Sequence, residues 1–375
     1  MAIETGAGPA VRAQPDLAFH GDRELAAGLT DLAVNVRPGP PPPWLRAAIR
    51  DAVDDLAAYP DPAAATAAVA RRHARPESEV LVTAGAAEAF TLIARAFRPR
   101  HAVVVHPQFT EPEAALLAAG HEVGRVILEP DFQLDPRRIP ARADLVVIGN
   151  PTNPTAVLHP AAVLAGLARP GRTLVVDEAF ADCGPGEPES LAAARDLPGL
   201  IVVRSLTKTW GLAGLRAGYL LAGPGHVRAL ARPRPPWAVS GPALAAVVAC
   251  CTPRALAEAR AWAAAMGAER DRWAAALARL PGIRLTPHSQ ASFLLFECSL
   301  PSLPVPAGAV PHPGPVAGPR VRERLRQAGF AVRRGDTFPG LGPDWLRVAV
   351  RDRATNDRFT AALAAVLGTL EEVTQ

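Results

Sequence analysis

The chain has 375 residues, of which 49% are hydrophobic and 20% charged, and its formal net charge is +4. A chain of this length can bury a substantial core, either as two domains or as one large α/β domain with an appendage. No block of basic residues with interleaved aromatics occurs, so we do not expect nucleic acid as a partner. The apolar stretch 243–251 is too short to span a bilayer, and the N-terminus lacks the pattern of a signal peptide.

Four cysteines are too few for a disulfide framework, and their spacing is not that of paired metal ligands. We therefore expect a reduced, cytoplasmic protein without a structural metal. The four are Cys183, Cys250, Cys251 and Cys298.

The first 15 or so residues show no pattern of regular structure. From about residue 80 to 222, runs rich in Val, Ile and Leu alternate with Ala-rich stretches of helical spacing. Most runs are continuously apolar, which is typical of strands buried on both faces of a largely parallel sheet. The pattern predicts a doubly wound α/β domain of about seven strands. The runs are EVLVTAG (79–85), HAVVVHP (101–107), HEVGRVIL (121–128), ADLVVIGNP (143–151), TLVVDEA (173–179), LIVVRS (200–205) and AGYLLAG (217–223).

The C-terminal third predicts a smaller α+β domain. A long helix is expected from about Arg254 to Leu280, where a Pro-Gly pair stops it. A strand (292–297) and a Pro-rich segment (300–319) follow, and we expect the latter to be an irregular surface loop. A helix (320–329) and two strands (330–334 and 346–351) complete the chain. We expect an N-terminal arm (1–45), a large domain (46–255) and a small domain (256–375).

Lys208 is the only lysine of the chain, since 40 basic residues minus this one leave 39 arginines. Arginine stays protonated in proteins, whereas a desolvated lysine can become a neutral, nucleophilic amine. A compositional bias with one ordinary surface lysine would explain the same count. The residues that accompany Lys208 must therefore decide its role.

Small and polar residues follow four of the predicted strands. In a doubly wound sheet, ligands bind beyond the carboxyl ends of the strands, so these stretches can converge on one edge. They are TAGAAE (83–88), NPTNPT (150–155), DEAF (177–180) and SLTK (205–208).

These stretches offer groups that could bind a phosphate at a helix N-terminus. Each group alone is also typical of an ordinary turn, a helix cap or a surface arginine. The candidate donors are the N–H groups of Gly85, Ala86 and Ala87, the hydroxyls of Ser205 and Thr207, and the guanidinium of Arg216.

Asp177 ends an otherwise apolar strand, so its carboxylate is either a helix cap or the partner of a buried cation. A protonated pyridine nitrogen is such a cation, and an aspartate of this kind with a Schiff-base lysine is the pattern of pyridoxal phosphate sites. Asn153 lies before Pro154, which restricts its backbone. Phe109 follows a strand and could stack on a flat ring. Pyridoxal phosphate explains all these features together.

The motifs YPDP (59–62), NPTNPT, DEAF and SLTKTWGLAGLRAGY (205–219), in this order and spacing, resemble the fold type I, class I/II aminotransferase superfamily. The resemblance extends over nearly the whole chain from about Phe19. It implies pyridoxal 5'-phosphate (PLP) as cofactor, a large α/β domain with a mostly parallel seven-stranded sheet, and a small α+β domain.

The resemblance also implies a role for each candidate residue. Lys208 would form the Schiff base, Asp177 would bind the pyridine nitrogen, Asn153 the phenolic oxygen, and Phe109 would stack on the ring. The phosphate would be bound by Gly85, Ala86, Ala87, Ser205, Thr207 and Arg216. Tyr59 would reach the phosphate of a neighbouring subunit, which implies a symmetric homodimer. Arg347 would grip the substrate carboxylate.

Two branches of the superfamily compete. Histidinol-phosphate aminotransferases share YPDP and the lysine segment, but usually have tyrosine at the position of Phe180. Threonine-phosphate decarboxylases are similar in the His-Gly pair at His20, in Asn35, in Phe180 and in segment 330–351. The segment HGDR (20–23) and Ser292 depart from the decarboxylase pattern.

We expect decarboxylation of L-threonine O-3-phosphate, a reaction of cobalamin biosynthesis, with Arg333 and His20 binding the distal phosphate. The alternative is an aminotransferase acting on histidinol phosphate or another amino acid. A cofactor-binding regulatory domain is disfavoured, because no DNA-binding segment accompanies the fold.

Overall fold

A computed structural model describes residues 16–299 and 317–372. The first 15 residues, which we predicted to lack regular structure, lie outside the described residues. So does most of the Pro-rich segment. Residues 317–319, which we predicted to be loop, instead begin helix α10 (Ala317–Gln327). The helix can begin here because Gly318 N donates to Asp344 Oδ1 at 2.8 Å. Pro319 does not prevent it, since a proline is tolerated in the first turn of a helix.

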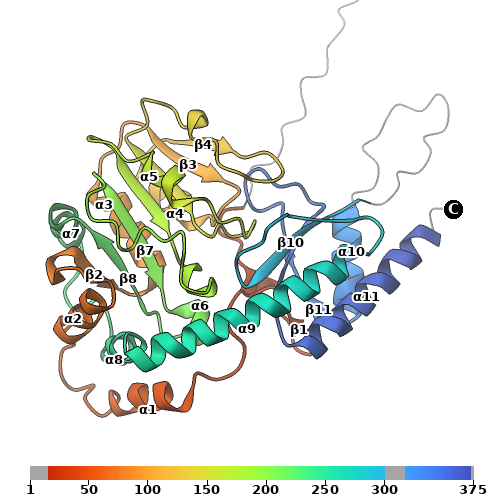
Figure 1. Ribbon diagram of the computed structural model, residues 1–375, viewed down its shortest axis with the longest axis horizontal. Coiled ribbons are helices and arrows are strands. Elements are labelled where there is room, and N and C mark those ends of the chain that lie inside the picture. Colours follow the sequence, from red (N-terminus) through yellow and green to blue (C-terminus); the bar gives the residue numbers. More distant parts are fainter. Residues whose placement is uncertain (1–15, 300–316, 373–375) are drawn as a thin grey trace, which may run out of the picture.

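A seven-stranded sheet forms the centre of the N-terminal two thirds (Figure 1), and all seven predicted runs are strands of it. The strand order is β2-β8-β7-β6-β5-β3-β4, and every pair is parallel except those of β8 with β2 and β7. The strands are β2 (Val80–Thr83), β3 (Ala102–His106), β4 (Val123–Ile127), β5 (Leu145–Gly149), β6 (Thr173–Asp177), β7 (Leu200–Ser205) and β8 (Gly218–Ala222).

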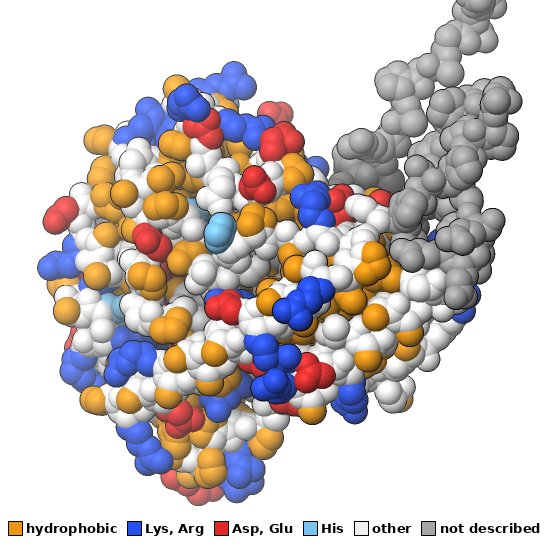
Figure 2. All heavy atoms as spheres, turned by 45° about the vertical axis from the view of Figure 1, so that its right-hand side comes forward, with side chains coloured by type: hydrophobic (Ala, Val, Ile, Leu, Met, Phe, Trp, Pro, Cys, Tyr) orange, Lys and Arg blue, Asp and Glu red, His pale blue; other side chains and the backbone are white. Residues whose placement is uncertain are grey.

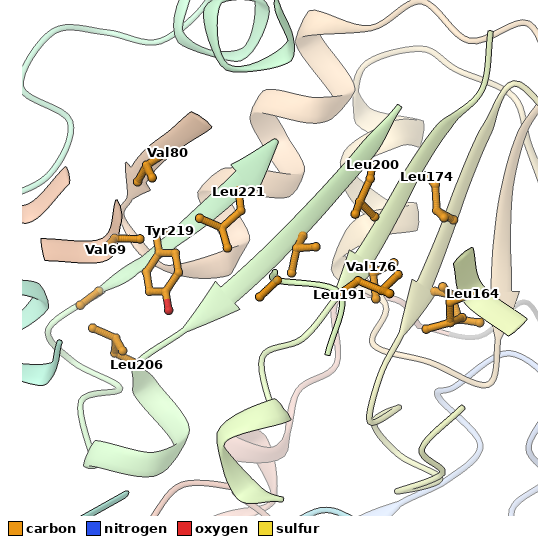
Figure 3. Close-up of a cluster of buried hydrophobic side chains, with 14 of the residues drawn as sticks. Val69, Val80, Leu164, Leu174, Val176, Leu191, Leu200, Leu206, Tyr219 and Leu221 are labelled. Atoms are coloured by element: carbon orange, nitrogen blue, oxygen red, sulfur yellow. The ribbon is translucent and has the colours of Figure 1, made fainter. Parts of the chain in front are cut away.

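Helices cover both faces of this sheet, because alternate side chains of each strand enter different apolar clusters. In β7, Leu200 and Val202 belong to one cluster, while Ile201 and Val203 belong to the other. Figure 3 shows part of the first cluster, where Val69 and Leu164 meet side chains of the strands. The first face is covered by α1 (Pro43–Asp51), α2 (Ala63–Arg72), α5 (Ala161–Ala165) and α8 (Gly241–Cys250), the second by α3 (Gly85–Ala96), α4 (Glu111–Ala118) and α7 (Pro224–Ala231).

The C-terminal third forms a smaller antiparallel sheet packed against helices. Its strand order is β12-β13-β10-β9, and β1 pairs separately with β11. The predicted long helix is α9 (Pro253–Leu277), which begins after the cap Thr252 and ends three residues before the expected Leu280. The other elements are β1 (Thr30–Asp31), β9 (Ile283–Leu285), β10 (Phe293–Cys298), β11 (Phe330–Ala331), β12 (Arg333–Arg334), β13 (Trp345–Ala349) and α11 (Arg353–Glu372).

The N-terminal segment 16–42 connects the two sheets. It pairs with the smaller part through Leu32, whose amide donates to Ala331 O at 2.9 Å and whose carbonyl accepts from Ala349 N at 2.8 Å. It then reaches the larger part, where Arg37 N donates to Lys208 O at 2.9 Å. The domain limits at residues 45 and 255 stay a prediction.

Charged side chains of both signs are interspersed with apolar ones on the face shown in Figure 2. In the described ranges, no single helix is long and apolar enough to cross a membrane; only α8 and α9 taken together, with a 75° bend between them, meet that length and composition.

Candidate active site

A cavity of about 120 Å³ lies beyond the carboxyl ends of the central strands. The four predicted strand-end stretches all contribute to its walls, as parallel strands require. Nine of the residues expected around the cofactor line it: Ala86, Ala87, Phe109, Asn153, Asp177, Ser205, Thr207, Lys208 and Arg216. Ala179 and Phe180 complete the lining.

Lys208 projects from the four-residue helix α6 (Thr207–Trp210), which Gly211 ends in a left-handed conformation with φ +68°. Its Nζ lies 5.5 Å from the centre of the Phe180 ring. Burial, helped by the positive charge of Arg347, lowers the pKa of the amine to about 8, although Asp177 acts in the opposite direction. The amine is therefore much closer to its neutral, nucleophilic form at physiological pH than an exposed lysine.

Asp177 ends β6 with its side chain in the cavity and only 8% of its surface exposed. Burial raises the pKa of its carboxyl to about 6, opposed by the amide of Ala179 and the charge of Lys208. Among the described residues, no basic group lies within 4.0 Å of it. A buried carboxylate in this state fits a cationic ring nitrogen, so the donor set agrees with a pyridinium partner.

The phosphate-binding candidates meet at the N-terminus of α3. Gly85 begins this helix with φ +77°, and a side chain there would come within 2.9 Å of the Arg216 guanidinium. Gly85 does not line the cavity. Its lack of a side chain allows Arg216 to lie against the helix. Within the described part of the chain Arg216 has no carboxylate partner, which leaves its charge available to an anion.

Arg347 is buried in β13 and reaches the cavity through Asn153. It donates to Asn153 Oδ1 and to Ala33 O. Asn35, with its amide oxygen turned toward Arg347, accepts from Nε at 3.2 Å and from Nη1 at 3.0 Å. Burial and the neighbouring Arg333 lower the pKa of the Arg347 guanidinium.

Arg333 lies opposite Arg347 in the β12–β13 register and is 2% exposed. Its guanidinium lies over the rings of Phe19 and Phe338, and donates to Phe19 O at 2.7 Å. Burial lowers its pKa to about 10. Neither Arg333 nor Arg347 has a carboxylate within 4.0 Å in residues 16–299 and 317–372. Two buried cations without carboxylate partners indicate a binding site for an anionic substrate.

Two other predicted residues lie outside the cavity lining. His20 Nε2 is 2.6 Å from Glu111 Oε1, and its ring centre is 5.7 Å from that of Phe109. Tyr59 is 76% exposed and stacks on the exposed Trp237 with ring centres 4.1 Å apart. Within one chain the structure does not bring Tyr59 to the other candidates.

Sequence reasoning missed a buried ionic network behind the cavity. Arg204, directly before Ser205, donates to Glu178 at 3.0 Å, to Glu187 at 2.6 Å and also to Asp182. Arg72 donates to Asp182 at 2.7 Å. The sequence feature that could have indicated the network is Arg204 itself, an arginine within an apolar strand. Its partners could not be identified, because they lie 17 to 26 residues away along the chain.

The fold and the site together define a class of enzyme. Residues 27–363 match the family model "Aminotransferase class I and II". The chain belongs to this family and is a PLP-dependent enzyme, as the resemblance implied. When bound, PLP withdraws electrons from the carbon that bears the substrate amine.

Two relatives bear on the choice between an aminotransferase and a decarboxylase. The chain is 46% identical over 336 residues to a histidinol-phosphate aminotransferase of Mycobacterium bovis, covering 89% of this chain and 86% of the relative. It is 32% identical over 356 residues to the threonine-phosphate decarboxylase of Salmonella typhimurium, covering 90% and 91%. These findings support the alternative of an aminotransferase better than the expected decarboxylase.

Solved structures agree on the fold. The histidinol-phosphate aminotransferase of Clostridium acetobutylicum superposes with a TM-score of 0.80 at 22% identity, over 91% of this chain and 100% of that one. The expected PLP-dependent transferase fold type I is confirmed.

Proposed function

We propose that this protein is a PLP-dependent aminotransferase acting on a phosphorylated amine of the histidinol phosphate type. The observation that supports PLP chemistry is the pairing, in one cavity, of an amine with a pKa lowered to about 8 and a buried carboxyl. The 46% identical relative supports the substrate type.

The proposal gives each cavity residue a task. Asp177 binds the ring nitrogen of the cofactor and keeps it protonated, and Asn153 donates to the ring oxygen. Arg216, Ser205, Thr207 and the N-terminus of α3 bind the cofactor phosphate. Lys208 Nζ would hold the cofactor and, as the nearby base, would take a proton from the substrate carbon and return one.

Arg333 and Arg347 bind the anionic group of the substrate, with His20 at the edge of the site. Because both guanidinium groups are buried without carboxylate partners, an incoming phosphate forms ion pairs in surroundings where water screens them little. Phe180 lines the cavity and packs against Phe293, with ring centres 5.0 Å apart, so this wall of the cavity is apolar and limits the access of water.

We also propose that the active protein is a homodimer in which Tyr59 completes the site of its partner. Tyr59 lies far more exposed than an aromatic side chain usually is in a monomer. It lies in an exposed apolar patch, the Tyr59 patch, whose members Leu56, Tyr59 and Trp237 line one surface hollow.

Decarboxylation of L-threonine O-3-phosphate is the second candidate. It is favoured by the presence of two buried guanidinium groups, because this substrate has both a carboxylate and a phosphate. Phe180 also favours it, since a phenyl ring offers no hydroxyl to the cofactor.

A substrate panel tests the proposal. The PLP-loaded protein is incubated with histidinol phosphate and a 2-oxo acid, and separately with L-threonine O-3-phosphate. We expect amino transfer in the first reaction, dependent on the oxo acid, and no CO₂ in the second. CO₂ released without an oxo acid would overturn the proposal in favour of the second candidate. Unphosphorylated histidinol is the control, and its kcat/KM should be at least tenfold lower.

A further inference from the structure

Asn153 lies in a ten-residue loop, 150–159, between β5 and α5, which we call the Asn153 loop. Both ends of this loop meet at Asn150, which is 1% exposed. Its Oδ1 accepts from His159 N at 2.7 Å, and its Nδ2 donates to His159 O at 3.1 Å. The side chain thus pairs with the backbone of His159 as a neighbouring strand would.

Two further bonds of Asn150 connect the loop to its surroundings. Its backbone N–H donates to Asp177 O at 2.8 Å, which is the bond that closes the β5–β6 pairing at Gly149 and Asp177. Its Nδ2 also donates to Glu189 O at 3.3 Å. Asn150 therefore links both ends of the Asn153 loop to Asp177, the residue that binds the cofactor nitrogen in the proposed function.

Hydrogen bonds of Thr152 connect the closed ends of the loop to the position of Asn153. Thr152 Oγ1 donates to Gly149 O at 2.6 Å, and Thr152 N donates to Val157 O at 2.9 Å. Ala156 N donates to Thr152 O at 2.7 Å. The residue that precedes Asn153 is thus bonded on both sides, and its position depends on the distance between the two ends of the loop.

We propose that Asn150 is a positioning residue, which closes the Asn153 loop and thereby aims the amide of Asn153 at the ring oxygen of the cofactor. The inference rests on the proposed function, since it needs a cofactor in the cavity. Asn150 does not itself line the cavity, so any effect on the cofactor has to pass through the loop.

The bound cofactor supplies a readout that needs no substrate, namely the pH midpoint of its visible absorbance. An amide that donates to the anionic ring oxygen stabilises the deprotonated form, so loss of this bond raises the midpoint. Asn153→Ala should raise it by about one pH unit. Asn150→Ala should raise it by at least half as much.

The double variant Asn150→Ala/Asn153→Ala separates positioning from general damage. If Asn150 acts through Asn153, the double variant has the midpoint of Asn153→Ala alone. An additive shift, or an unchanged midpoint in Asn150→Ala, would overturn the proposal. Should Asn150→Ala fail to fold, Asn150→Asp keeps the acceptor for His159 N and loses the donors, and the same outcomes apply.

Asn356 provides a matched control, because it makes the same kind of bonds with partners outside the Asn153 loop. It is 0% exposed, accepts from Arg351 N at 3.1 Å, and donates to Arg351 O at 2.9 Å and to Glu269 Oε1 at 2.8 Å. Asn356→Ala should lower the unfolding temperature without moving the midpoint. An equal shift in this variant would also overturn the proposal. If the wild-type protein shows no visible band with PLP, the proposed function itself fails.

Discussion

Lys208 owes its chemistry to two features of its surroundings. Burial disfavours the charged form of the amine, and the positive charge of Arg347 adds to this effect, so the pKa falls from 10.5 to about 8. Asp177 limits the decrease. The same position occupied by arginine would satisfy the charge but could not attach a cofactor.

The pH dependence of cofactor attachment tests this account. Only the neutral amine attacks the PLP aldehyde, so the attachment rate should rise with pH by about tenfold per unit below pH 8 and level off above it. Arg347→Met removes a nearby positive charge, which raises the pKa of Lys208 and moves the plateau to higher pH. Stopped-flow absorbance measures this rate.

Arg333→Met serves as the control for that experiment. Arg333 is as buried as Arg347, but its charge is not among the causes of the Lys208 pKa shift. In Arg333→Met, the pH at which the attachment rate levels off should stay near that of the wild-type protein. A plateau that moves to lower pH in Arg347→Met would contradict the electrostatic explanation.

At the scale of elements, α3 and the segment after α6 jointly form the phosphate site that the proposed function requires. Helix α3 supplies backbone N–H groups at its positive end, and Arg216 supplies a guanidinium. They fit together because Gly85 has no side chain at their contact.

Gly85→Ala should therefore weaken PLP binding by about 10-fold to 100-fold, because the added methyl displaces Arg216 and a charge-assisted bond is lost. The φ of +77° adds strain to the folded state. Fluorescence titration with PLP measures the Kd. Gly225→Ala in α7, where a methyl would meet nothing within 4 Å, should leave the Kd unchanged. Equal Kd values for the two variants would show that the contact is unimportant.

The elements of the large sheet were predictable from the sequence, because strands buried on both faces need continuous apolar runs. The run LIVVRS became β7, with Arg204 included. What this arginine contacts was not predictable, because Glu178, Asp182 and Glu187 meet it only after the loop following β6 folds back. The start of α10 was missed because glycine and proline at 318 and 319 resemble a loop.

At the scale of the whole molecule, the exposed Tyr59 patch is explained by the proposed homodimer. Mixing two inactive variants tests whether the partner completes the site. In a heterodimer of Tyr59→Ala and Lys208→Ala, one site receives the intact Lys208 of one chain and the intact Tyr59 of the other. Random mixing should then restore about a quarter of the wild-type activity.

The outcome depends on which site Tyr59 serves. If it acted within its own chain, both sites of every heterodimer would be defective and mixing would restore nothing. Refolding the variants together and separately, followed by size-exclusion chromatography, gives the control for dimer formation.

The sequence by itself determined the strands of the large sheet, the long helix α9 and the group of polar residues beyond the strand ends. These follow from local periodicity and from the common direction of parallel strands. Only the tertiary structure decided which distant groups complete the site. Arg347 reaches Asn153 across 194 residues, and Asn150 closes its loop through two backbone groups. The contact of Arg347 depends on how the smaller sheet packs against the larger part. The contacts of Asn150 depend on how the loop after β5 folds back on itself, which the periodicity of the sequence does not encode.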